Sequence, residues 1–221
     1  MRVRASLWAG VLLVALAHST VASEPAWTQV LERGGVVVHE MTAGEGKPVQ
    51  SRARTQIDAT VFEILAFLQD DARRTEWMAR CIESRSLEKR SRWNRLSYTR
   101  LAIWPFSDRD VVVETLVSLD PRATSADIWM RSVDSELQAP VQGVVRMPSM
   151  RGNFHLEQID RGTQVDFTLS MDLGGRVPTG IALYARQMIP LESLENLREL
   201  VPSSRGTYAE LVRTWQSELP P

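Results

Sequence analysis

The stretch Gln164-Val-Asp-Phe-Thr-Leu-Ser-Met-Asp-Leu173 decides the fold class, because its polar and apolar residues alternate without exception. A period of two is typical of a β-strand with one face on the core and the other in water. Gly174-Gly175 interrupts this pattern, and Pro178 suits the first turn of a helix. From Ile181 to Val201 the apolar residues recur at helical spacing. A strand that leads directly into one long helix is therefore expected, with a kink where proline interrupts it.

Other runs of alternating or β-branched residues predict a chain rich in strands. They are residues 36–41, 51–58, 87–104, 110–119, 126–133, 143–148, 152–160 and 164–173. Three further segments predict helices: residues 24–33, a helix begun by the capping box Thr60-Val-Phe-Glu63, and residues 208–219. This order predicts an α+β domain in which helices pack on a strongly curved antiparallel sheet.

The first 23 residues have the pattern of a secretory signal peptide. Arg2 and Arg4 precede an apolar run at residues 5–17, and Val21-Ala-Ser23 offers small residues for cleavage before Glu24. The apolar run is shorter than the roughly 20 residues that span a bilayer, although an uncleaved anchor is the alternative. No cysteine follows it to carry a lipid anchor. We expect one mature domain, residues 24–221, that is soluble and periplasmic or secreted.

Composition and charge narrow the function. Apolar residues make up 43% and charged residues 24%, which is typical of a globular domain. The net charge is −1, and loss of Arg2 and Arg4 with the leader lowers it to −3. Such a domain is a poor electrostatic partner for nucleic acid. No nucleic-acid partner is therefore expected.

No catalytic or metal-binding motif is visible in the sequence. Cys81 is the single cysteine, so no intrachain disulfide can form, and we expect it to be a small buried residue on a helix. His39 and His155 fall in predicted strands with no second ligand at metal-binding spacing, which favours solvated sheet histidines. We expect no metal, no cofactor and no catalytic residue.

Two features leave alternatives open. The stretch Trp104-Pro-Phe-Ser-Asp-Arg-Asp110 places two aromatic residues at a bend and an arginine between two aspartates. It indicates either ion pairing that holds the loop in place, or a cavity mouth lined by Arg109 and the aromatic rings. Met147, Met150, Met171 and Met188 fit either a filled core or a pocket wall that adapts to varied apolar ligands.

Five segments, taken in order, resemble those of START (StAR-related lipid-transfer) domains in the Bet v 1-like helix-grip superfamily. They are Trp77-Met-Ala-Arg-Cys-Ile82, Trp104 to Asp110, Val145-Arg-Met-Pro148 with Gly152-Asn-Phe154, Asp172-Leu-Gly-Gly-Arg-Val-Pro178, and Pro190-Leu-Glu-Ser-Leu-Glu-Asn-Leu-Arg198. The resemblance covers about residues 25–200. It implies a curved antiparallel sheet around a long C-terminal helix, with an internal apolar tunnel that holds a lipid or another apolar molecule.

The resemblance also implies which segments open the tunnel. At two positions this chain differs from sterol-binding START domains. The lids would be the loop from Trp104 to Asp108 and the helix that begins near Pro178. Sterol-binding members tend to carry an arginine where this chain has Thr115, and an asparagine of their last helix is replaced by Leu183. The tunnel wall is thus expected to be uniformly apolar. An empty apolar tunnel would cost a large part of the folding free energy, so we expect it to be wet, collapsed or occupied.

The leading hypothesis is therefore a carrier or sequestering protein without a chemical step, with transient membrane contact. Its expected lining is Trp104, Phe106, Met147, Phe167, Leu169, Met171, Ile181, Tyr184, Ala185 and Met188, with Arg109 as a head-group contact. One alternative is a helix-grip enzyme of the cyclase or hydrolase type, for which Tyr184, Asp172 and Arg109 are the candidates. Another is a partner-binding module with a filled core.

Overall fold

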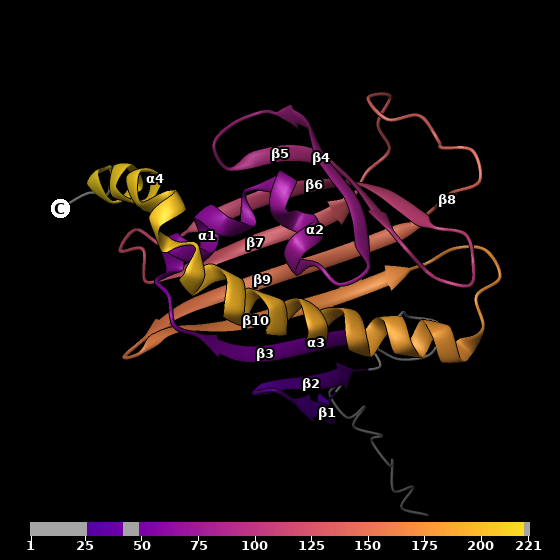
Figure 1. Cartoon of the computed structure of the whole chain (residues 1–221), viewed down its shortest axis with the longest axis horizontal. Coiled ribbons are helices and arrows are strands. Elements are labelled where there is room, and N and C mark those ends of the chain that lie inside the picture. The colour runs from indigo at the N-terminus through magenta and orange to yellow at the C-terminus, as the bar shows by residue number, and fades with distance from the viewer. Residues whose placement is uncertain (1–25, 42–48, 219–221) are drawn as a thin grey trace, which may run out of the picture.

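A computed structural model describes residues 26–41 and 49–218, and its strands form one curved sheet (Figure 1). The strands are β1 (Thr28–Arg33), β2 (Val36–Met41), β3 (Gln50–Ile57), β4 (Cys81–Lys89), β5 (Asn94–Leu101), β6 (Arg109–Leu119), β7 (Ser125–Ser132), β8 (Val145–Arg146), β9 (Ser149–Ile159) and β10 (Gly162–Asp172). Their order across the sheet is β1-β2-β3-β10-β9-β7-β6-β5-β4. The described pairs are antiparallel, except that β8 lies parallel to β6.

The helices lie on one face of this sheet (Figure 1). They are α1 (Val61–Leu68), the 3-10 turn η1 (Asp71–Arg73), α2 (Arg74–Trp77), α3 (Thr179–Ser203) and α4 (Arg205–Ser217). The long helix α3 contacts β2, β3 and β10, and it also contacts α2. The predicted α+β helix-grip architecture, a curved antiparallel sheet around a long C-terminal helix, is confirmed.

The core lies between α3 and the inner face of the sheet. Val165, Phe167 and Leu169 of β10 are buried, as their alternation predicts. Phe167 pairs across the strands with Phe154 of β9, and the two rings stack with centroids 4.1 Å apart. The β10–α3 connection also follows the prediction, since Gly174 has a positive φ of +65° directly after the strand.

The capping box at Thr60 forms as predicted and begins α1. The Thr60 hydroxyl accepts a hydrogen bond from the Glu63 main-chain N–H, and the Glu63 carboxylate accepts one from the Thr60 N–H at 2.7 Å. These bonds satisfy N–H groups that the first turn of a helix leaves unpaired. Of the eight residues in α1, all but Glu63 are buried.

The prediction of a helix over residues 24–33 is wrong. Thr28–Arg33 is strand β1, which pairs with β2. The reason lies in Gly34 and Gly35, whose φ angles of +57° and +77° suit the two-residue turn of a β-hairpin. They fold the chain back, so that Arg33 lies opposite Val36.

Other predicted boundaries also need correction. Residues 87–104 belong to two strands, because the chain turns between Lys89 and Asn94 and β5 pairs with β4. Cys81 is buried as predicted, but it begins β4 opposite Leu101 rather than lying on a helix. Residues 143–148 hold only the two-residue strand β8.

The predicted long C-terminal helix is present as α3, which continues through Pro190 and Pro202. The short helix predicted at residues 208–219 corresponds to α4, and residue 219 lies outside the described residues. The predicted signal peptide, residues 1–23, and the loop at residues 42–48 also lie outside them. Among the helices described, none is both long and apolar enough to cross a membrane.

Candidate functional site: the interior between helix and sheet

A small inner cavity lies between α2 and the inner face of the sheet. Its lining residues come from α2, the residue after it, and five strands: Arg74, Trp77, Met78, Thr99, Val113, Met130, Met150 and Phe167. The volume is about 10 Å³, which is close to the space that one water molecule needs. Sites that hold small organic ligands occupy roughly 300–1,000 Å³. The interior is thus nearly closed in this conformation.

Methionine forms much of the cavity wall. Met78 follows α2, Met130 lies on β7 and Met150 lies on β9, and all three side chains reach the same cavity. Methionine is unbranched and polarizable, so it repacks around ligands of varied shape at low cost. A wall of this kind can move aside when the cavity enlarges.

A polar cluster lies behind the apolar wall of the inner cavity. The buried Arg74 guanidinium bonds the Asp71 carboxylate at 2.6 Å and the hydroxyls of Ser97 and Thr99 at 3.0 and 3.1 Å. The indole Nε1 of Trp77, another residue of the wall, has no hydrogen-bond partner among the described residues. A buried donor without a partner is costly, so an acceptor atom placed beside this indole would be favourable.

The structure brings most of the predicted lining together, although only Phe167 touches the inner cavity. Met147, Leu169 and Ala185 are buried in the same apolar cluster, and four partly buried side chains pack against it: Phe106, Met171, Ile181 and Met188. Trp104 and Tyr184 are instead 87% and 41% exposed. They lie outside the core that the other predicted residues form.

Six cavity residues were not predicted as lining, and Met150 was expected either in the core or in a pocket wall. The six are Arg74, Trp77, Met78, Thr99, Val113 and Met130. A signal for part of this set exists in β5, where Arg95, Ser97 and Thr99 occupy alternate positions and are all buried. Buried polar side chains in a row on the inner face of a sheet need hydrogen-bond partners, because burial without them is costly. Arg74 supplies them at two of these positions.

Arg109 is buried and holds two loops together. Its guanidinium donates to the carbonyl oxygens of Leu173 and Gly174 at 3.2 and 3.3 Å, and also to that of Ser107. These bonds join the start of β6 to the loop that leads into α3. In this conformation the Arg109 donors bond main-chain oxygens. The role of Arg109 as a contact for a lipid head group stays a prediction.

The aspartates on either side of Arg109 pair with other arginines. Asp108 accepts hydrogen bonds from Arg100, one of them at 2.8 Å. Asp110 is 1% exposed and accepts from Arg146 at 2.8 Å and from the Tyr98 hydroxyl at 3.2 Å. Burial, together with the Asp110 carboxylate, raises the pKa of Tyr98 to about 12. The loop is therefore held by ion pairs.

Helix α3 is packed unevenly along its length. Residues 179–184 are exposed or half-buried, whereas Ile189, Pro190 and Leu191 are almost completely buried. No side-chain cap satisfies the first turn of α3 at Pro178. The N-terminal part of the helix therefore has fewer contacts to lose if it moves away from the sheet.

His39, His155 and Cys81 show no catalytic arrangement in the described part of the chain. His155 Nδ1 lies 3.1 Å from the Asp127 carboxylate and points away from the core, as predicted. Burial lowers the pKa of His39, with nearby Arg52 and Arg54 adding to the shift. Burial raises the pKa of the Cys81 thiol to about 11. Within residues 26–41 and 49–218, no cluster of His, Cys, Asp or Glu side chains is suited to hold a metal ion.

The outer face of the sheet carries a larger hollow that the sequence does not reveal. This outer groove has a volume of about 810 Å³ and is lined mainly by outward-facing residues of β6, β7, β9 and β10, among them Leu116, Trp129 and Arg151. Leu116 and Trp129 are register partners that are 41% and 55% exposed.

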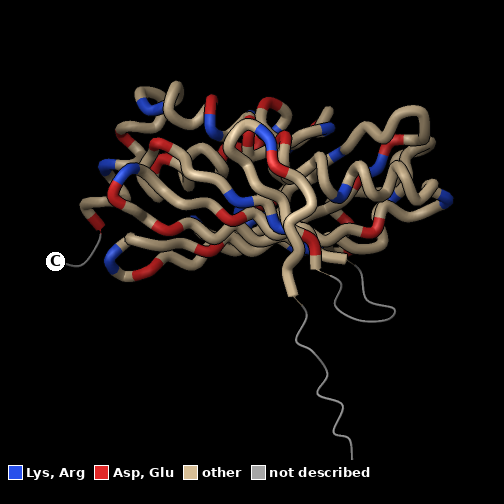
Figure 2. Tube along the Cα trace, turned by 90° about the horizontal axis from the view of Figure 1, so that it is seen from below, with Lys and Arg blue, Asp and Glu red and all other residues tan. Residues whose placement is uncertain are grey.

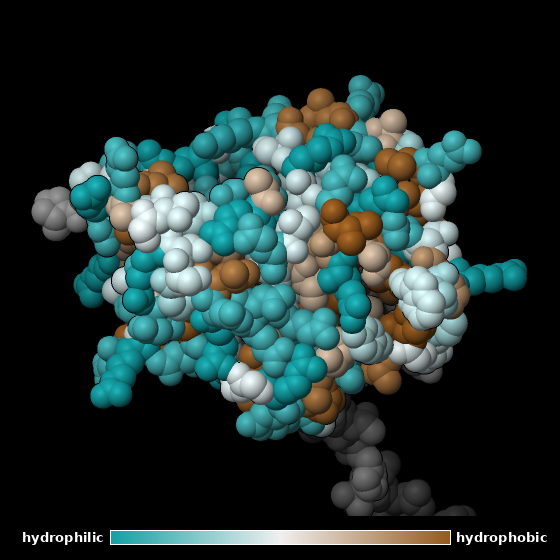
Figure 3. All heavy atoms as spheres, in the orientation of Figure 1, coloured by the Kyte–Doolittle hydropathy of each residue, from teal (hydrophilic) through white to brown (hydrophobic). Residues whose placement is uncertain are grey.

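In the view of Figure 3, apolar residues form small separate patches among polar ones. Figure 2 shows acidic and basic residues interspersed along the trace, without a large region of one sign.

Comparison with known proteins supports the same fold. No family model matches the chain. An uncharacterized protein of Pseudomonas aeruginosa is 26% identical over 174 residues, which cover 78% of this chain and 85% of that protein. A STAR-related lipid transfer protein from Xanthomonas axonopodis superimposes with a TM-score of 0.72 at 22% identity, covering 80% of this chain and 98% of that one. Human StAR-related lipid transfer protein 5 gives 0.72 at 19% identity, covering 80% and 86%.

The topology and the position of the long helix define this chain as a helix-grip protein. More narrowly, it has the fold of START domains, as the sequence resemblance implies. Both of the structures compared above are of lipid transfer proteins.

Proposed function

We propose that this protein binds a lipid or another apolar small molecule between α3 and the inner face of the sheet, and that it does so without a chemical step. The observation that supports this most is the methionine-lined inner cavity, which lies between α2 and the inner face of the sheet in a fold shared with lipid transfer proteins. Helix α2 in turn contacts α3. The cavity wall is apolar, which favours an apolar ligand.

Binding requires the interior to enlarge from about 10 Å³. The cost is met by burial of ligand, which contributes roughly 25 cal/mol for each Å² of apolar surface removed from water. The N-terminal part of α3 is the segment that we propose to move, because its residues are more exposed than the rest of the helix. Met78, Met130 and Met150 would then repack around the bound chain.

We also propose that Trp104 and Tyr184 touch a membrane during exchange. Trp104 lies in the loop before β6 and Tyr184 in the exposed part of α3. Both side chains have an apolar ring with a polar group, a composition that favours the interface of a bilayer. Arg80, which bonds the Tyr184 hydroxyl and lies with its guanidinium 5.4 Å from the ring centroid, adds a positive charge at this rim.

For the location, we propose export to the periplasm or the exterior with removal of residues 1–23. The support is the signal-peptide pattern at the N-terminus. N-terminal sequencing of the exported protein tests it, because cleavage would give a chain that begins at Glu24. A chain that keeps residues 1–23 and stays with the membrane would contradict it.

Ligand binding is tested on protein purified with its leader from the exported fraction. Native mass spectrometry shows whether a passenger is bound, and organic extraction followed by mass analysis identifies its class. A defined lipid or apolar metabolite at near-stoichiometric occupancy is the expected result. Protein that is empty, and that also takes up none of a panel of fluorescent lipids, would contradict the proposal.

A further inference from the structure

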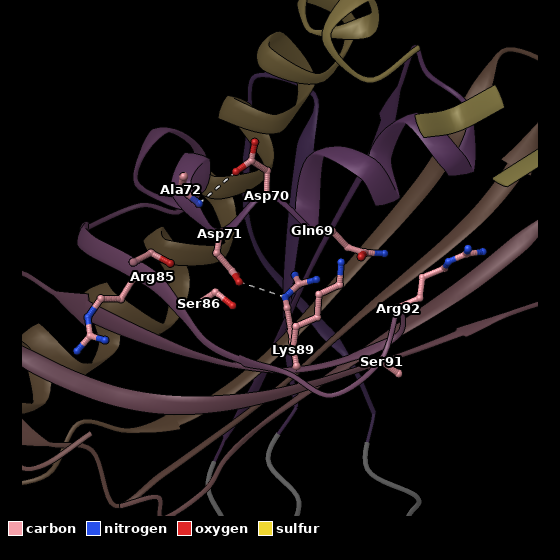
Figure 4. A pocket seen from close by; sticks show the side chains of 11 residues that line it. Gln69, Asp70, Asp71, Ala72, Arg85, Ser86, Lys89, Ser91 and Arg92 are labelled. Carbon is pink, nitrogen blue, oxygen red and sulfur yellow. Dashed lines mark hydrogen bonds and ion pairs between the residues drawn. The ribbon is translucent and has the colours of Figure 1, made fainter. Parts of the chain in front are cut away.

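A second pocket, separate from the apolar interior, lies where η1 meets the hairpin of β4 and β5 (Figure 4). Its volume is about 390 Å³. In Figure 4 the Lys89 side chain points from the hairpin toward Gln69, whereas Arg85 and Arg92 point away from the centre. Side chains from separate segments of the chain therefore line one space.

Three buried side-chain atoms around this charged pocket have no hydrogen-bond partner among the described residues. They are Gln69 Nε2, Ser84 Oγ and Arg95 Nε. Arg95 is only 8% exposed; its Nη2 donates to the Leu68 carbonyl oxygen at 2.9 Å, and its Nε forms an ion pair with the Asp71 carboxylate at 3.4 Å but no hydrogen bond. Gln69 Nε2 and Arg95 Nε can only donate, and Ser84 can also donate. Unused buried donors on one pocket require an acceptor ligand.

Charged side chains of both signs line the pocket. Arg85 and Arg92 point away from its centre and lie near Glu83 and Glu218, which leaves Lys89 and Arg95 with two acids, Asp70 and Asp71. Asp71 is shared between Arg74 at 2.6 Å and Arg95 Nε at 3.4 Å, and Asp70 accepts from the Tyr208 hydroxyl at 2.8 Å. Lys89 forms no ion pair within the described part of the chain. An anion would supply the missing partner.

Burial makes the Arg95 charge costly, and Asp71 offsets only part of this cost. Desolvation lowers the pKa of Arg95, while Asp71 acts in the opposite direction. A bound anion would offset this cost, because charge-assisted hydrogen bonds are stronger than neutral ones.

We propose that the charged pocket binds a phosphate group through Gln69, Ser84, Lys89 and Arg95. The donors come from the end of α1 and from two strands, and a phosphate group offers several strong acceptor oxygens for them. The group is either free phosphate, a soluble phosphate ester, or the phosphate of a lipid head group. The site does not depend on lipid binding in the interior, since the two cavities have no lining residue in common.

The test is calorimetric titration of the mature protein with inorganic phosphate and with glycerol 3-phosphate, against chloride at equal ionic strength. Lys89→Gln and Ser84→Ala are compared with Arg151→Gln, which removes one positive charge from an exposed arginine on the outer face. We expect phosphate to bind, and Lys89→Gln to weaken binding about tenfold or more, since it removes a charged donor. Arg151→Gln should change it less than about twofold.

Sedimentation with phosphatidic acid vesicles and with phosphatidylcholine vesicles distinguishes the source of the group. Binding to phosphatidic acid that Lys89→Gln abolishes, without binding of soluble phosphate, would assign the site to a lipid head group. Binding of soluble phosphate alone would assign it to free phosphate or an ester. The proposal is overturned if neither form binds, or if Lys89→Gln and Arg151→Gln weaken binding equally. Loss of this site would leave uptake of apolar ligands into the interior unaffected.

Discussion

The side-chain hydroxyl of Ser193 accepts a hydrogen bond of 3.0 Å from the main-chain N–H of Ala79. Three residues further along α3, the Asn196 amide donates to the carbonyl oxygen of Trp77 at 3.1 Å. Both bonds join the C-terminal half of α3 to the end of α2 and the residues just after it. The helix is thus fixed at one end, so opening of the interior is expected at the other.

Replacing Ser193 with alanine removes this connection. The Ala79 N–H is buried and would lose its acceptor, so we expect Ser193→Ala to lower the free energy of unfolding by about 1–3 kcal/mol. Urea denaturation measures the change. Ser203→Ala, at an exposed serine of the same helix, should stay within about 0.5 kcal/mol. Equal effects of the two substitutions would show that the Ser193 bond does not stabilise the protein.

Met150→Ala enlarges the inner cavity by shortening one of its walls. We expect it to cost about 2–5 kcal/mol of stability, because the buried side chain leaves a void. An apolar ligand that fills the void should restore part of this loss, by linkage of binding to folding. Thermal unfolding with and without the extracted ligand measures both effects. Leu137→Ala, at a loop residue that is 54% exposed, serves as the control and should show neither.

Tyr184→Ala weakens the exposed end of α3. It removes the contact with Arg80, a partly exposed interaction, so the stability should fall by less than about 1 kcal/mol. If this end of the helix opens, exchange of a fluorescent lipid should nevertheless become faster. Stopped-flow transfer to acceptor vesicles measures the rate. Leu211→Ala, at an equally exposed residue of α4, should leave the rate unchanged, and unchanged exchange in Tyr184→Ala would place the opening elsewhere.

Trp104→Ala tests the membrane contact. Its ring is 87% exposed, so removal should have little effect on folding while it weakens partition into vesicles severalfold. Vesicle sedimentation of the variant is compared with that of Trp129→Ala, whose ring is 55% exposed on the outer face of the sheet. A stronger effect of the Trp129 substitution would assign membrane contact to the outer groove.

The pKa of Cys81 predicts a loss of stability at high pH. Burial raises this pKa from an ordinary value of 9.0 to about 11 in the folded protein. Between these values the unfolded chain releases a proton that the folded protein keeps, so the free energy of unfolding falls as the pH rises from 9 to 11. Cys81→Ala should flatten this part of the profile. Alkylation by iodoacetamide at pH 8 should also be much slower in folded protein than in urea, because the thiolate is the reactive form.

The fold could be predicted from the sequence where a periodic pattern stands beside a clear stop signal. The alternation that ends at Leu173 and the capping box at Thr60 both led to correct elements. A helix was wrongly predicted at residues 24–33 because Trp27, Val30 and Leu31 have helical spacing. The chain instead folds back at Gly34 and Gly35 as a hairpin. Pairing with a neighbouring strand outweighed the local helical pattern.

The inner cavity could be predicted only in part, because its walls depend on which strands become neighbours. Phe167 follows from the alternation of β10. Met130 and Thr99 reach the cavity because the order of strands in the sheet places β7 and β5 on either side of β6. No local sequence pattern specifies that order. The outer groove depends likewise on the curvature of four strands and on the register that sets Leu116 beside Trp129.

Photo-crosslinking with a diazirine-bearing lipid, followed by peptide mapping, shows directly whether the lipid binds between α3 and the sheet. We expect labels on residues that face the interior, Met130, Met150 and Phe167 above all, and on the N-terminal part of α3. Excess unlabelled ligand should abolish them. Labels confined to Trp129 and the other residues of the outer groove, with none in the interior, would contradict it.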